Sequence, residues 1–524
     1  MTQQACIISN LTLDFPQQKV FDNIYFQLPL NSFSGLVGKN GQGKSLLMSI
    51  LHLQKKNGVA YSGQILWQCP HQHLTQLQQI KESTIAQALN IHELYFCFER
   101  IKQGIASFAD YDQVENLWHL PAHWQQLLES ANLPIDLDTR IQDLSEGQKT
   151  KLALCRLFIL KDHYLLLDEP SNHLDTQGRK WLIDQMSQHP TGGLIISHDR
   201  QLLDQVQGIF VLNQLGLHYY SGNYSHYQQQ HLIQVEALSK AVHQEKREIR
   251  ALKEQQHQNQ MKAQKRKKTG EKLRASGSQA PILLDAKKEQ AEQSLSHLRN
   301  QQIKRLADAK DNLMQKQSQL EHLKSQSFEF NHITVKTGEI LRCQDLTLAF
   351  NLSISINFVM NASEKIHIQG ENGIGKSTLL KTIQGLIKPH DGKMYCNVQT
   401  AYLDQNLSFL AGEISATEYL KTINANLTEQ QIRTSLGNMK IRRDKALIPL
   451  KNLSGGERLK VALLALKFQH VELLLLDEPE NHLDIESREL LAHAIKHFNG
   501  SVLLVSHDDS FVDACEITNS YHLK

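Results

Sequence analysis

Long apolar runs, paired cysteines and a secretory leader are absent from this sequence. No window approaches the roughly 18 consecutive apolar residues of a membrane-spanning helix. The seven cysteines stand singly, without the Cys-x-x-Cys pair that zinc, an iron–sulfur cluster or a redox couple would use. The first residues, MTQQACIISN, contain neither the basic nor the apolar block of a signal peptide. We therefore expect a protein of the reducing cytoplasm, in which any membrane role would require another chain.

The chain is long enough for two or three domains, and its charge is unevenly distributed. It has 524 residues, of which 40% are hydrophobic, as in a globular protein. The formal net charge is +2, yet residues 236–324 hold 20 Lys and Arg against 11 Asp and Glu. Positive charge is thus concentrated in this middle segment, and the remainder of the chain is net acidic.

One long segment of the sequence occurs twice. The stretch from Leu11 to about Tyr220 recurs, motif by motif, from Leu346 to the C-terminus. GKNGQGKS matches GENGIGKST, YLLLDEPSNHLD matches LLLLDEPENHLD, and IISHD matches LVSHD. In both copies the DEP aspartate lies 23 residues after the serine of an LSxG motif and 30 residues before the SHD histidine. We predict two copies of one domain, residues 1–224 and 331–524, separated by residues 225–330.

The spacing of apolar residues predicts the fold class. The apolar runs that end at Asp168 and Asp477 are continuous, which is typical of parallel strands buried between helices. Each copy is therefore expected to be an α/β domain. Between the copies, two runs with three- and four-residue apolar spacing flank the polar stretch Thr269–Pro281. This pattern predicts an antiparallel helical hairpin with its turn in that stretch, and a first helix over residues 228–268 would be about 60 Å long.

Each copy contains a G-x-x-x-x-G-K-[ST] loop, the P-loop of nucleotide-binding proteins. In such a loop the backbone N–H groups surround the phosphates, the lysine neutralises the β- and γ-oxygens, and the hydroxyl binds magnesium. Two matches, both flanked by strand-like segments, make a chance occurrence negligible, so we predict ATP and Mg²⁺ as cofactors. The predicted phosphate-binding residues are Gly38, Asn40, Gly41, Gly43, Lys44, Ser45, Gly370, Asn372, Gly373, Gly375, Lys376, Ser377 and Thr378.

An acidic pair ends one buried strand of each copy. A carboxylate at such a strand end can hold magnesium or its water ligands, and the predicted magnesium set is Ser45, Asp168, Ser377 and Asp477. The glutamate that follows each aspartate is expected to polarise the attacking water, although an acidic pair can also cap a helix. The SHD histidine is expected to sense the γ-phosphate, the alternative being a hydrogen-bonded core histidine. The predicted catalytic residues are Glu169, Glu478, His198 and His507.

Three further kinds of residue are predicted to complete the nucleotide pockets. LSEGQ and LSGGE each present a serine and backbone N–H groups at the positive end of a helix, but the same letters also describe a capping box. A glutamine after a short strand is expected to report on the magnesium site, unless it is ordinary surface. An aromatic ring at a strand end is expected to stack on adenine, unless it belongs to the core. These candidates are Ser145, Gly147, Ser454, Gly455, Gly456, Gln68, Gln405, Phe15 and Phe350.

The predicted tip of the hairpin is strongly basic. Seven cations occur within thirteen residues, against a single acid, Glu271. Such density suits the phosphates of RNA, whereas the alternative is a solvated helix face. The candidate RNA-binding residues are Lys262, Lys265, Arg266, Lys267, Lys268, Lys272 and Arg274.

Taken in order, the P-loop, LSxG, DEP and SHD motifs make the whole chain resemble a tandem ATP-binding-cassette ATPase. DEPSNHLD and DEPENHLD are similar to the DEPTNHLD of the ABC-F group, and GNYSHY (Gly222–Tyr227) is similar to its linker entrance. The charged hairpin occupies the place of that group's linker. The resemblance implies a fold of two P-loop NTPase ATP-binding-cassette domains joined by a helical hairpin linker.

The same resemblance implies how the motifs pair and what they act on. In this family the two cassettes close head-to-tail over two ATP molecules within one chain. Lys44 and Glu169 would then face Ser454, and Lys376 and Glu478 would face Ser145. The linker of the family enters the ribosome and influences transfer RNA, so ribosomal RNA and transfer RNA are the implied partners, with no membrane subunit. Members serve in antibiotic protection, rescue of stalled ribosomes, assembly or initiation control, and the sequence does not choose among these roles.

Two departures from the family pattern predict unequal pockets. Leu46 follows the first P-loop where the second copy has Thr378, which removes a hydroxyl, and Glu146 stands in the first LSxG motif where glycine is usual. A carboxylate in the first turn of a helix is also ordinary dipole complementarity. Three other functions stay open: a transporter ATPase, which would need a membrane partner; a DNA-maintenance ATPase, whose coil usually interrupts a single cassette; and a ribosome-binding scaffold, which would not need Glu169 and Glu478.

Overall fold

The chain forms two compact units in this computed structural model. One unit joins Met1–Tyr224 with Gln326–Lys524, and the other is Ser225–Ser325. The structure describes residues 3–15, 18–54, 60–74, 82–172, 174–213, 216–275, 281–323, 326, 328–330, 337–349, 351–371, 373–405, 407–410, 412–441, 443–481 and 483–523. None of the described helices combines the length and the apolarity that a membrane crossing requires.

The first copy combines a mainly parallel sheet with a smaller antiparallel sheet. Along the main sheet the strand order is β5-β6-β7-β3-β8-β9, and the antiparallel sheet has the order β2-β1-β4. The neighbours β5/β6, β6/β7, β7/β3 and β3/β8 all pair in parallel. The strands are β1 (Gln4–Phe15), β2 (Gln18–Pro29), β3 (Ser32–Val37), β4 (Ser62–Trp67), β5 (His71–Leu74), β6 (Tyr164–Asp168), β7 (Gly192–Ile196), β8 (Gly208–Asn213) and β9 (Gly216–Ser221).

Helices of the first copy flank the main sheet and form a separate helical region. The helices are α1 (Lys44–Leu53), α2 (Ile85–Ala88), α3 (His92–Lys102), α4 (Phe108–Val114), α5 (Leu120–Ser130), the 3-10 helix η2 (Ile141–Asp143), α6 (Glu146–Phe158), α7 (Thr176–Gln188) and α8 (Arg200–Leu203). The stretch from α3 to α5 fills residues 92–130, where the first copy is longer than the second.

The second copy repeats this plan. Its main sheet has the order β14-β15-β16-β12-β17 and its antiparallel sheet β11-β10-β13. The strands are β10 (Glu339–Leu348), β11 (Asn351–Asn361), β12 (Lys365–Gln369), β13 (Asp391–Cys396), β14 (Thr400–Leu403), β15 (Leu473–Asp477), β16 (Ser501–Val505) and β17 (Asn519–His522). The helices are α11 (Lys376–Ile383), η3 (Ser408–Leu410), α12 (Ala416–Ile423), α13 (Glu429–Asn438), η4 (Arg443–Ala446), η5 (Leu450–Asn452), α14 (Gly455–Gln469), α15 (Ile485–Lys496) and α16 (Asp509–Ala514).

Burial of the central strands explains why their sequences are mainly apolar. Every residue of β6, β7, β15 and β16 is buried. Parallel strands covered on both faces must be apolar at every position rather than at alternate ones. The prediction of an α/β fold for each copy is therefore confirmed. The strands β6 and β15, one in each main sheet, end at Asp168 and Asp477.

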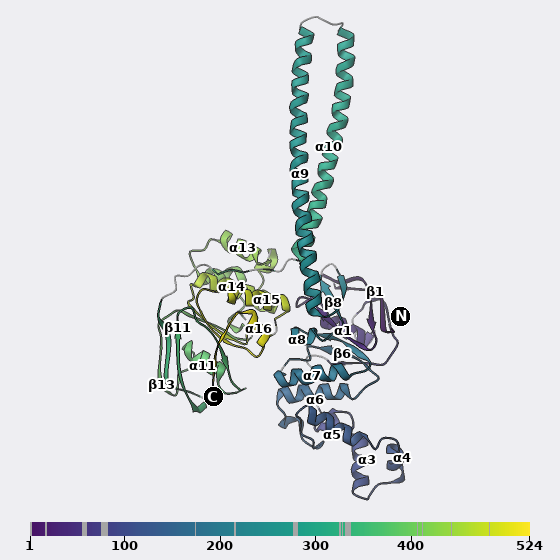
Figure 1. Ribbon diagram of the computed structural model, residues 1–524, viewed down its shortest axis with the longest axis vertical. Helices are drawn as coiled ribbons and strands as arrows, with labels where there is room; N and C mark the ends of the chain where they lie inside the picture. Colours follow the sequence, from purple (N-terminus) through teal and green to yellow (C-terminus); the bar gives the residue numbers. More distant parts are fainter. Residues whose placement is uncertain are drawn as a thin grey trace. The chain divides into compact units, whose positions relative to one another are not determined.

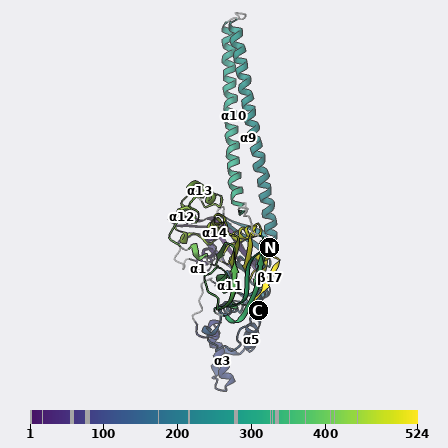
Figure 2. The same cartoon turned by 90° about the vertical axis from the view of Figure 1, so that its left-hand side faces the viewer.

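The second unit is an antiparallel pair of long helices, α9 (Tyr224–Ala275) and α10 (Pro281–Leu323). They run side by side in both views (Figure 1, Figure 2). Val242 and Ile249 of α9 are buried, and Lys316 Nζ of α10 pairs with Glu245 Oε1 of α9 at 2.6 Å. The first helix is longer than predicted, because α9 continues to Ala275 instead of ending near Lys268. Residues 269–275 include Lys, Leu, Arg and Ala, which favour helix strongly enough to accommodate Gly270.

Candidate nucleotide-binding site

Each P-loop joins a central strand to a helix and folds around its own lysine. Gly38 has φ of 155°, and a Cβ there would lie 2.4 Å from the carbonyl oxygen of Leu212, so the loop requires glycine. Lys44 Nζ donates a hydrogen bond to the carbonyl oxygen of Gly38 at 2.6 Å. In the second copy, Lys376 Nζ donates to the equivalent oxygen of Gly370 at 2.7 Å. The ammonium group lies beside the N-terminus of α1 or α11, where a phosphate finds both a cation and backbone donors.

The oxygen atoms required for a magnesium ion lie next to each other. Ser377 Oγ donates to Asp477 Oδ1 at 2.9 Å, and the Ser45 hydroxyl makes the equivalent bond to Asp168. Burial raises the pKa of Asp168, and the Ser45 bond and Lys44 oppose that rise. Asp168 Oδ1 is buried without a hydrogen-bond partner among the described residues. A hydroxyl beside a carboxylate with a spare buried oxygen fits Mg²⁺, which prefers oxygen ligands.

Both predicted catalytic glutamates have a left-handed backbone. Glu169 has φ of 50° and Glu478 has φ of 45°, a region that residues other than glycine rarely adopt. Such a conformation costs on the order of 1–3 kcal/mol and persists only where the surroundings fix it. Here the Glu169 N–H donates to Ile196 O at 2.9 Å, and the Glu478 N–H donates to Val505 O at the same distance. The sharp bend after each strand turns the carboxylate toward the SHD histidine.

The two glutamate–histidine pairs have similar geometry and different electrostatics. His198 Nε2 lies 3.2 Å from Glu169 Oε1, and His507 Nε2 lies 3.3 Å from Glu478 Oε1. Burial raises the pKa of Glu169 to about 8 and lowers the pKa of His198. Glu478 is half-buried, and the hydrogen bond from His507 lowers the pKa of its carboxyl group. The Glu169–His198 pair therefore favours a neutral carboxyl group beside a neutral imidazole, whereas the Glu478–His507 pair favours an ionised carboxylate.

The serine of each LSxG motif caps a helix. Ser145 precedes α6 and Ser454 precedes α14, and both form reciprocal capping boxes with the residue three positions on, Gln148 and Glu457. Glu146 pairs with Lys149 Nζ at 2.9 Å on the first turn of α6. The capping-box alternative therefore describes these side chains, and a role for the serines in nucleotide binding stays a prediction.

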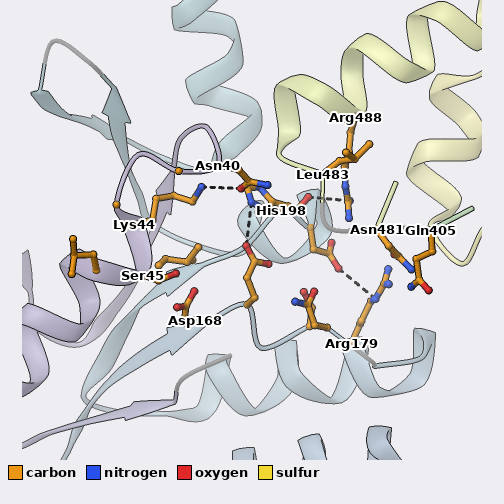
Figure 3. Close-up of a pocket in the computed structure, with 18 residues that line it drawn as sticks. Asn40, Lys44, Ser45, Asp168, Arg179, His198, Gln405, Asn481, Leu483 and Arg488 are labelled. Carbon is orange, nitrogen blue, oxygen red and sulfur yellow. Dashed lines mark hydrogen bonds and ion pairs between the residues drawn. The ribbon is translucent and has the colours of Figure 1, made fainter. Parts of the chain in front are cut away.

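A pocket of about 520 Å³ opens at the first P-loop and is lined by both copies. Figure 3 shows Lys44 and Asp168 on the first-copy side, with Asn481 and Arg488 reaching the pocket from the second copy. The backbone N–H of Asn40 donates to Asp484 Oδ2 at 2.9 Å. Arg488 Nη1 donates to the carbonyl oxygen of His198 at 3.1 Å and to Asp508 Oδ2 at 3.0 Å. The segment that follows Glu478 therefore contacts the opposite P-loop.

The second copy contributes to this pocket by a different segment from the one expected. Among the described lining residues are Gln405, Asn481, Leu483 and Arg488, and Ser454 is not one of them. The reason is electrostatic, because the exposed N–H groups of a P-loop attract a carboxylate and Asp484 supplies one. The pairing of Lys44 with Ser454 and that of Lys376 with Ser145 stay predictions.

The remaining candidates divide between described and undescribed residues. Gln405 follows β14 by two residues and lines the pocket of the first P-loop. Gln68 instead lies in the bend after β4, where its N–H donates to Ala5 O at 2.9 Å and its side chain is exposed. Two residues after β5, at the spacing of Gln405, the sequence has Gln76, which lies outside the described residues, as do Asn372 and Phe350. Phe15 ends β1, and its side chain is not among those described.

Three residues at or beside the pocket were not identified from the sequence. Arg179 and Arg488 both stand four residues after the last aspartate of the DEPxNHLD motif, and both line the pocket. Arg179 Nε lies 3.6 Å from Asp199 Oδ2, as Arg488 bonds Asp508. Their recurrence in both copies was a usable signal. The third, Glu480, is buried, accepts a hydrogen bond from Ser506, and has its pKa raised to about 7 by burial. The first copy has Ser171 at that position.

The fold and the site together define a tandem P-loop ATPase. The family model described as ABC transporter matches residues 21–172 and 354–481. An ATP-binding protein named YdiF in Bacillus subtilis is 30% identical over 97% of this chain and 78% of that protein. ATP-binding cassette sub-family F member 2 of Mus musculus is 27% identical over 96% of this chain and 77% of its own. Ribosome protection protein VmlR of Bacillus subtilis is 28% identical over 99% of this chain and 86% of its own.

The chain belongs to the ABC-F family of tandem ATP-binding-cassette ATPases. Its two copies are accordingly ATP-binding cassettes, and it is a P-loop ATPase.

Proposed function

We propose that this protein is an ATP-driven switch that acts on the ribosome. The observation that carries the proposal is the pocket at Lys44, because residues of both cassettes line it. A ligand that fills such a pocket contacts both cassettes at once, so its binding energy depends on how they are arranged. ATP binding would draw the cassettes together, and hydrolysis would release them.

Each group in the pocket has a distinct task in hydrolysis. Lys44 and the loop N–H groups would bind the phosphates, and Ser45 and Asp168 would hold Mg²⁺, which would supply positive charge close to the phosphate oxygens. Glu169 orients and polarises the attacking water, with His198 hydrogen-bonded to its carboxyl group. Lys376, Ser377, Asp477, Glu478 and His507 take the same tasks in the second cassette.

The ribosomal part of the proposal rests on one relative and on the hairpin. The name of the VmlR protein states that it protects ribosomes. The hairpin of this chain is net positive over its length, and Lys262, Lys265, Lys268 and Lys272 near its tip are exposed. Dense positive charge on an exposed helix suits ribosomal RNA and transfer RNA. The protein would work in the cytoplasm as a monomer, with its two cassettes pairing within one chain and no membrane subunit.

Removing both catalytic carboxylates should hold the protein in its ATP-bound state on the ribosome. Glu169→Gln with Glu478→Gln keeps the P-loops and magnesium ligands but loses the groups that activate water, so hydrolysis should fall by about 10²-fold or more. The closed state should accumulate, and the variant should sediment with ribosomes in ATP and inhibit translation when expressed.

The matched control changes the P-loop lysines instead. Lys44→Ala with Lys376→Ala weakens phosphate binding, so ATP should not increase its sedimentation with ribosomes. Sedimentation of the double glutamine variant that is the same with and without ATP would contradict the switch.

A further inference from the structure

Two ion pairs join the cassettes, and both have the same distribution of charge between them. Lys39 Nζ lies 2.9 Å from Glu486 Oε2, and Arg200 Nη2 lies 2.7 Å from Glu489 Oε1. In both pairs the first cassette supplies the cation and the second supplies the acid. The Arg200–Glu489 pair is about two-thirds shielded from solvent on each side, which reduces screening of its charges.

The duplicated sequence assigns a counterpart to each member of the second pair. Glu489 is five residues after Asp484, the last aspartate of its DEPxNHLD motif, and Lys180 is five residues after the equivalent Asp175. Arg200 directly follows the first SHD motif, and Asp509 directly follows the second. Lys180 and Asp509 therefore also have opposite charges. At each of the two positions, the charge in one cassette is opposite to the charge at the equivalent position of the other cassette.

In the structure, the counterpart residues Lys180 and Asp509 do not form an ion pair within the described part of the chain. Both residues are exposed. Lys180 occupies the fifth position of α7 and Asp509 the first position of α16, as Glu489 and Arg200 do in α15 and α8. A head-to-tail arrangement that places Arg200 against Glu489 places Asp509 against Lys180 when the second side of the interface closes.

We propose that these exchanged pairs, Arg200–Glu489 and Lys180–Asp509, form a charge code that makes the first cassette pair with the second. The Arg200–Glu489 side is already joined. Lys180 and Asp509 meet when ATP closes the second pocket, a step that rests on the closure assigned to ATP under the proposed function. The recognised surface is the partner cassette of the same chain.

The code also works against pairing between equivalent cassettes of two chains. Two first cassettes would bring Arg200 against Lys180, and two second cassettes would bring Asp509 against Glu489. Two second cassettes would also bring Glu371, the counterpart of Lys39, against Glu486. Like charges in contact penalise a wrong partner more than matched charges strengthen the right one. The exchange of signs therefore favours closure within one chain.

A simpler account exists for Asp509 alone. It is the first residue of α16, where an acid is favoured by the positive end of the helix. That account predicts that the effect of replacing Asp509 is independent of the residue at position 180. The charge code predicts instead that the two positions depend on each other.

Charge reversal separates the two accounts. Lys180→Glu and Asp509→Lys should each lower ATP turnover measured without ribosomes by about three- to tenfold, because an exposed ion pair changes an equilibrium by up to about fivefold and reversal adds repulsion. The double exchange, Lys180→Glu with Asp509→Lys, should restore turnover to within about twofold of the wild type. Asp112→Lys, the reversal of an exposed acid on α4, is the control and should leave turnover unchanged.

Cross-linking provides a second measurement that does not depend on turnover. In the Glu169→Gln, Glu478→Gln background, Lys180→Cys with Asp509→Cys should react with a short bismaleimide to give an intramolecular product in ATP and far less without it. The same protein without the two new cysteines corrects for Cys69 and Cys396, which are partly accessible. Single reversals that match Asp112→Lys, or a cross-link that ATP does not increase, would overturn the code. Ribosome sedimentation of the double glutamine variant involves neither position, so the proposed function is judged separately.

Discussion

The two catalytic glutamates occupy equivalent positions but differ in their readiness to accept a proton. Glu169 is enclosed with Lys44, Asp168 and Arg488 around it, and burial outweighs the attraction of the two cations. Glu478 is half-buried and receives hydrogen bonds from His507 and Asn481, the latter at 2.7 Å. Donors to a carboxylate stabilise its charged form, and burial without enough donors destabilises it. The protonation states of the pockets should therefore differ at neutral pH.

This difference predicts two pH profiles. A group that activates water must be ionised, and an acid with a raised pKa is ionised only as the pH rises through that value. With Glu478→Gln, the turnover of the Lys44 pocket should increase as the pH rises through about 8, the pKa of Glu169. With Glu169→Gln, turnover of the Lys376 pocket should already be level from pH 6 upward, because the pKa of Glu478 is lowered.

The measurement is kcat/KM for ATP against pH, which reports ionisation of the free enzyme. Wild-type protein should show both components. Coinciding profiles for the two single variants would show that the electrostatic difference has no effect on catalysis.

For individual residues, motif spacing predicted which side chains form the pockets but not their backbone conformation or pKa. The lysine, serine and carboxylates of each pocket were identified from sequence, since their types and order carry the chemistry. The left-handed backbone at Glu169 and Glu478 was not, because no local pattern requires it and the β7 and β16 carbonyls that hold it come from elsewhere in the chain. The raised pKa of Glu480 likewise depends on burial among neighbours distant in sequence.

At the scale of helices and strands, the hairpin shows which errors sequence reasoning makes. Its two helices were predicted from apolar spacing, but the polar stretch Thr269–Pro281 was assigned to the turn as a whole, whereas α9 continues through its first residues to Ala275. Gln68 follows a short strand, as expected, but that strand is β4 of the antiparallel sheet, whereas Gln405 follows β14 of the main sheet. The strand of the first copy that corresponds to β14 is β5, which begins at His71 and carries few apolar residues.

The hairpin tip leads to a prediction about salt. Replacing Lys265, Arg266, Lys267 and Lys268 with glutamine should weaken ATP-dependent ribosome binding and flatten its dependence on salt. Each phosphate contact that is lost should reduce the slope by about 0.7–0.9, because the cations release counterions when they bind nucleic acid. ATP turnover without ribosomes should be unchanged. Binding is measured by sedimentation across a series of salt concentrations.

The control removes four cations from the middle of the same helix. Lys246, Arg247, Arg250 and Lys253 are exposed on α9, and their replacement by glutamine changes the net charge equally. If both quadruple variants lose affinity to the same degree, net charge rather than tip contact is responsible. An unchanged salt slope for the tip variant would show that the tip is not an RNA contact.

For the molecule as a whole, the duplication was readable from the sequence, whereas the contacts between the two copies were not. Matching motifs at matching spacings predicted two equivalent cassettes, and the structure has them. Which surfaces meet depends on residues inside or shortly after the motifs, such as Lys39, Arg200 and Glu489, whose roles appear only when two distant segments are placed together. The departures at Leu46 and Glu146 remain expectations about unequal turnover, and Glu146 is already engaged by Lys149.

The contact of Arg488 with the opposite cassette predicts that this residue acts across the interface. Its Nη1 donates to the carbonyl oxygen of His198, and the His198 side chain bonds Glu169. Arg488→Ala should therefore disturb the Lys44 pocket, although Arg488 belongs to the second cassette.

In the Glu478→Gln background, Arg488→Ala should lower the rate of single-turnover hydrolysis by about tenfold. This corresponds to the loss of a hydrogen bond from a charged donor, which contributes roughly 1.5 kcal/mol or slightly less. In the Glu169→Gln background, where only the Lys376 pocket is active, the fall should be clearly smaller. Arg488→Lys keeps the charge but cannot reproduce the bonds from Nε to Glu480 O and from Nη1 to His198 O and Asp508 Oδ2, so its effect should lie between these. An equal or larger effect in the Glu169→Gln background would mean that Arg488 works through Asp508 within its own cassette, and that the bond to His198 does not couple the two.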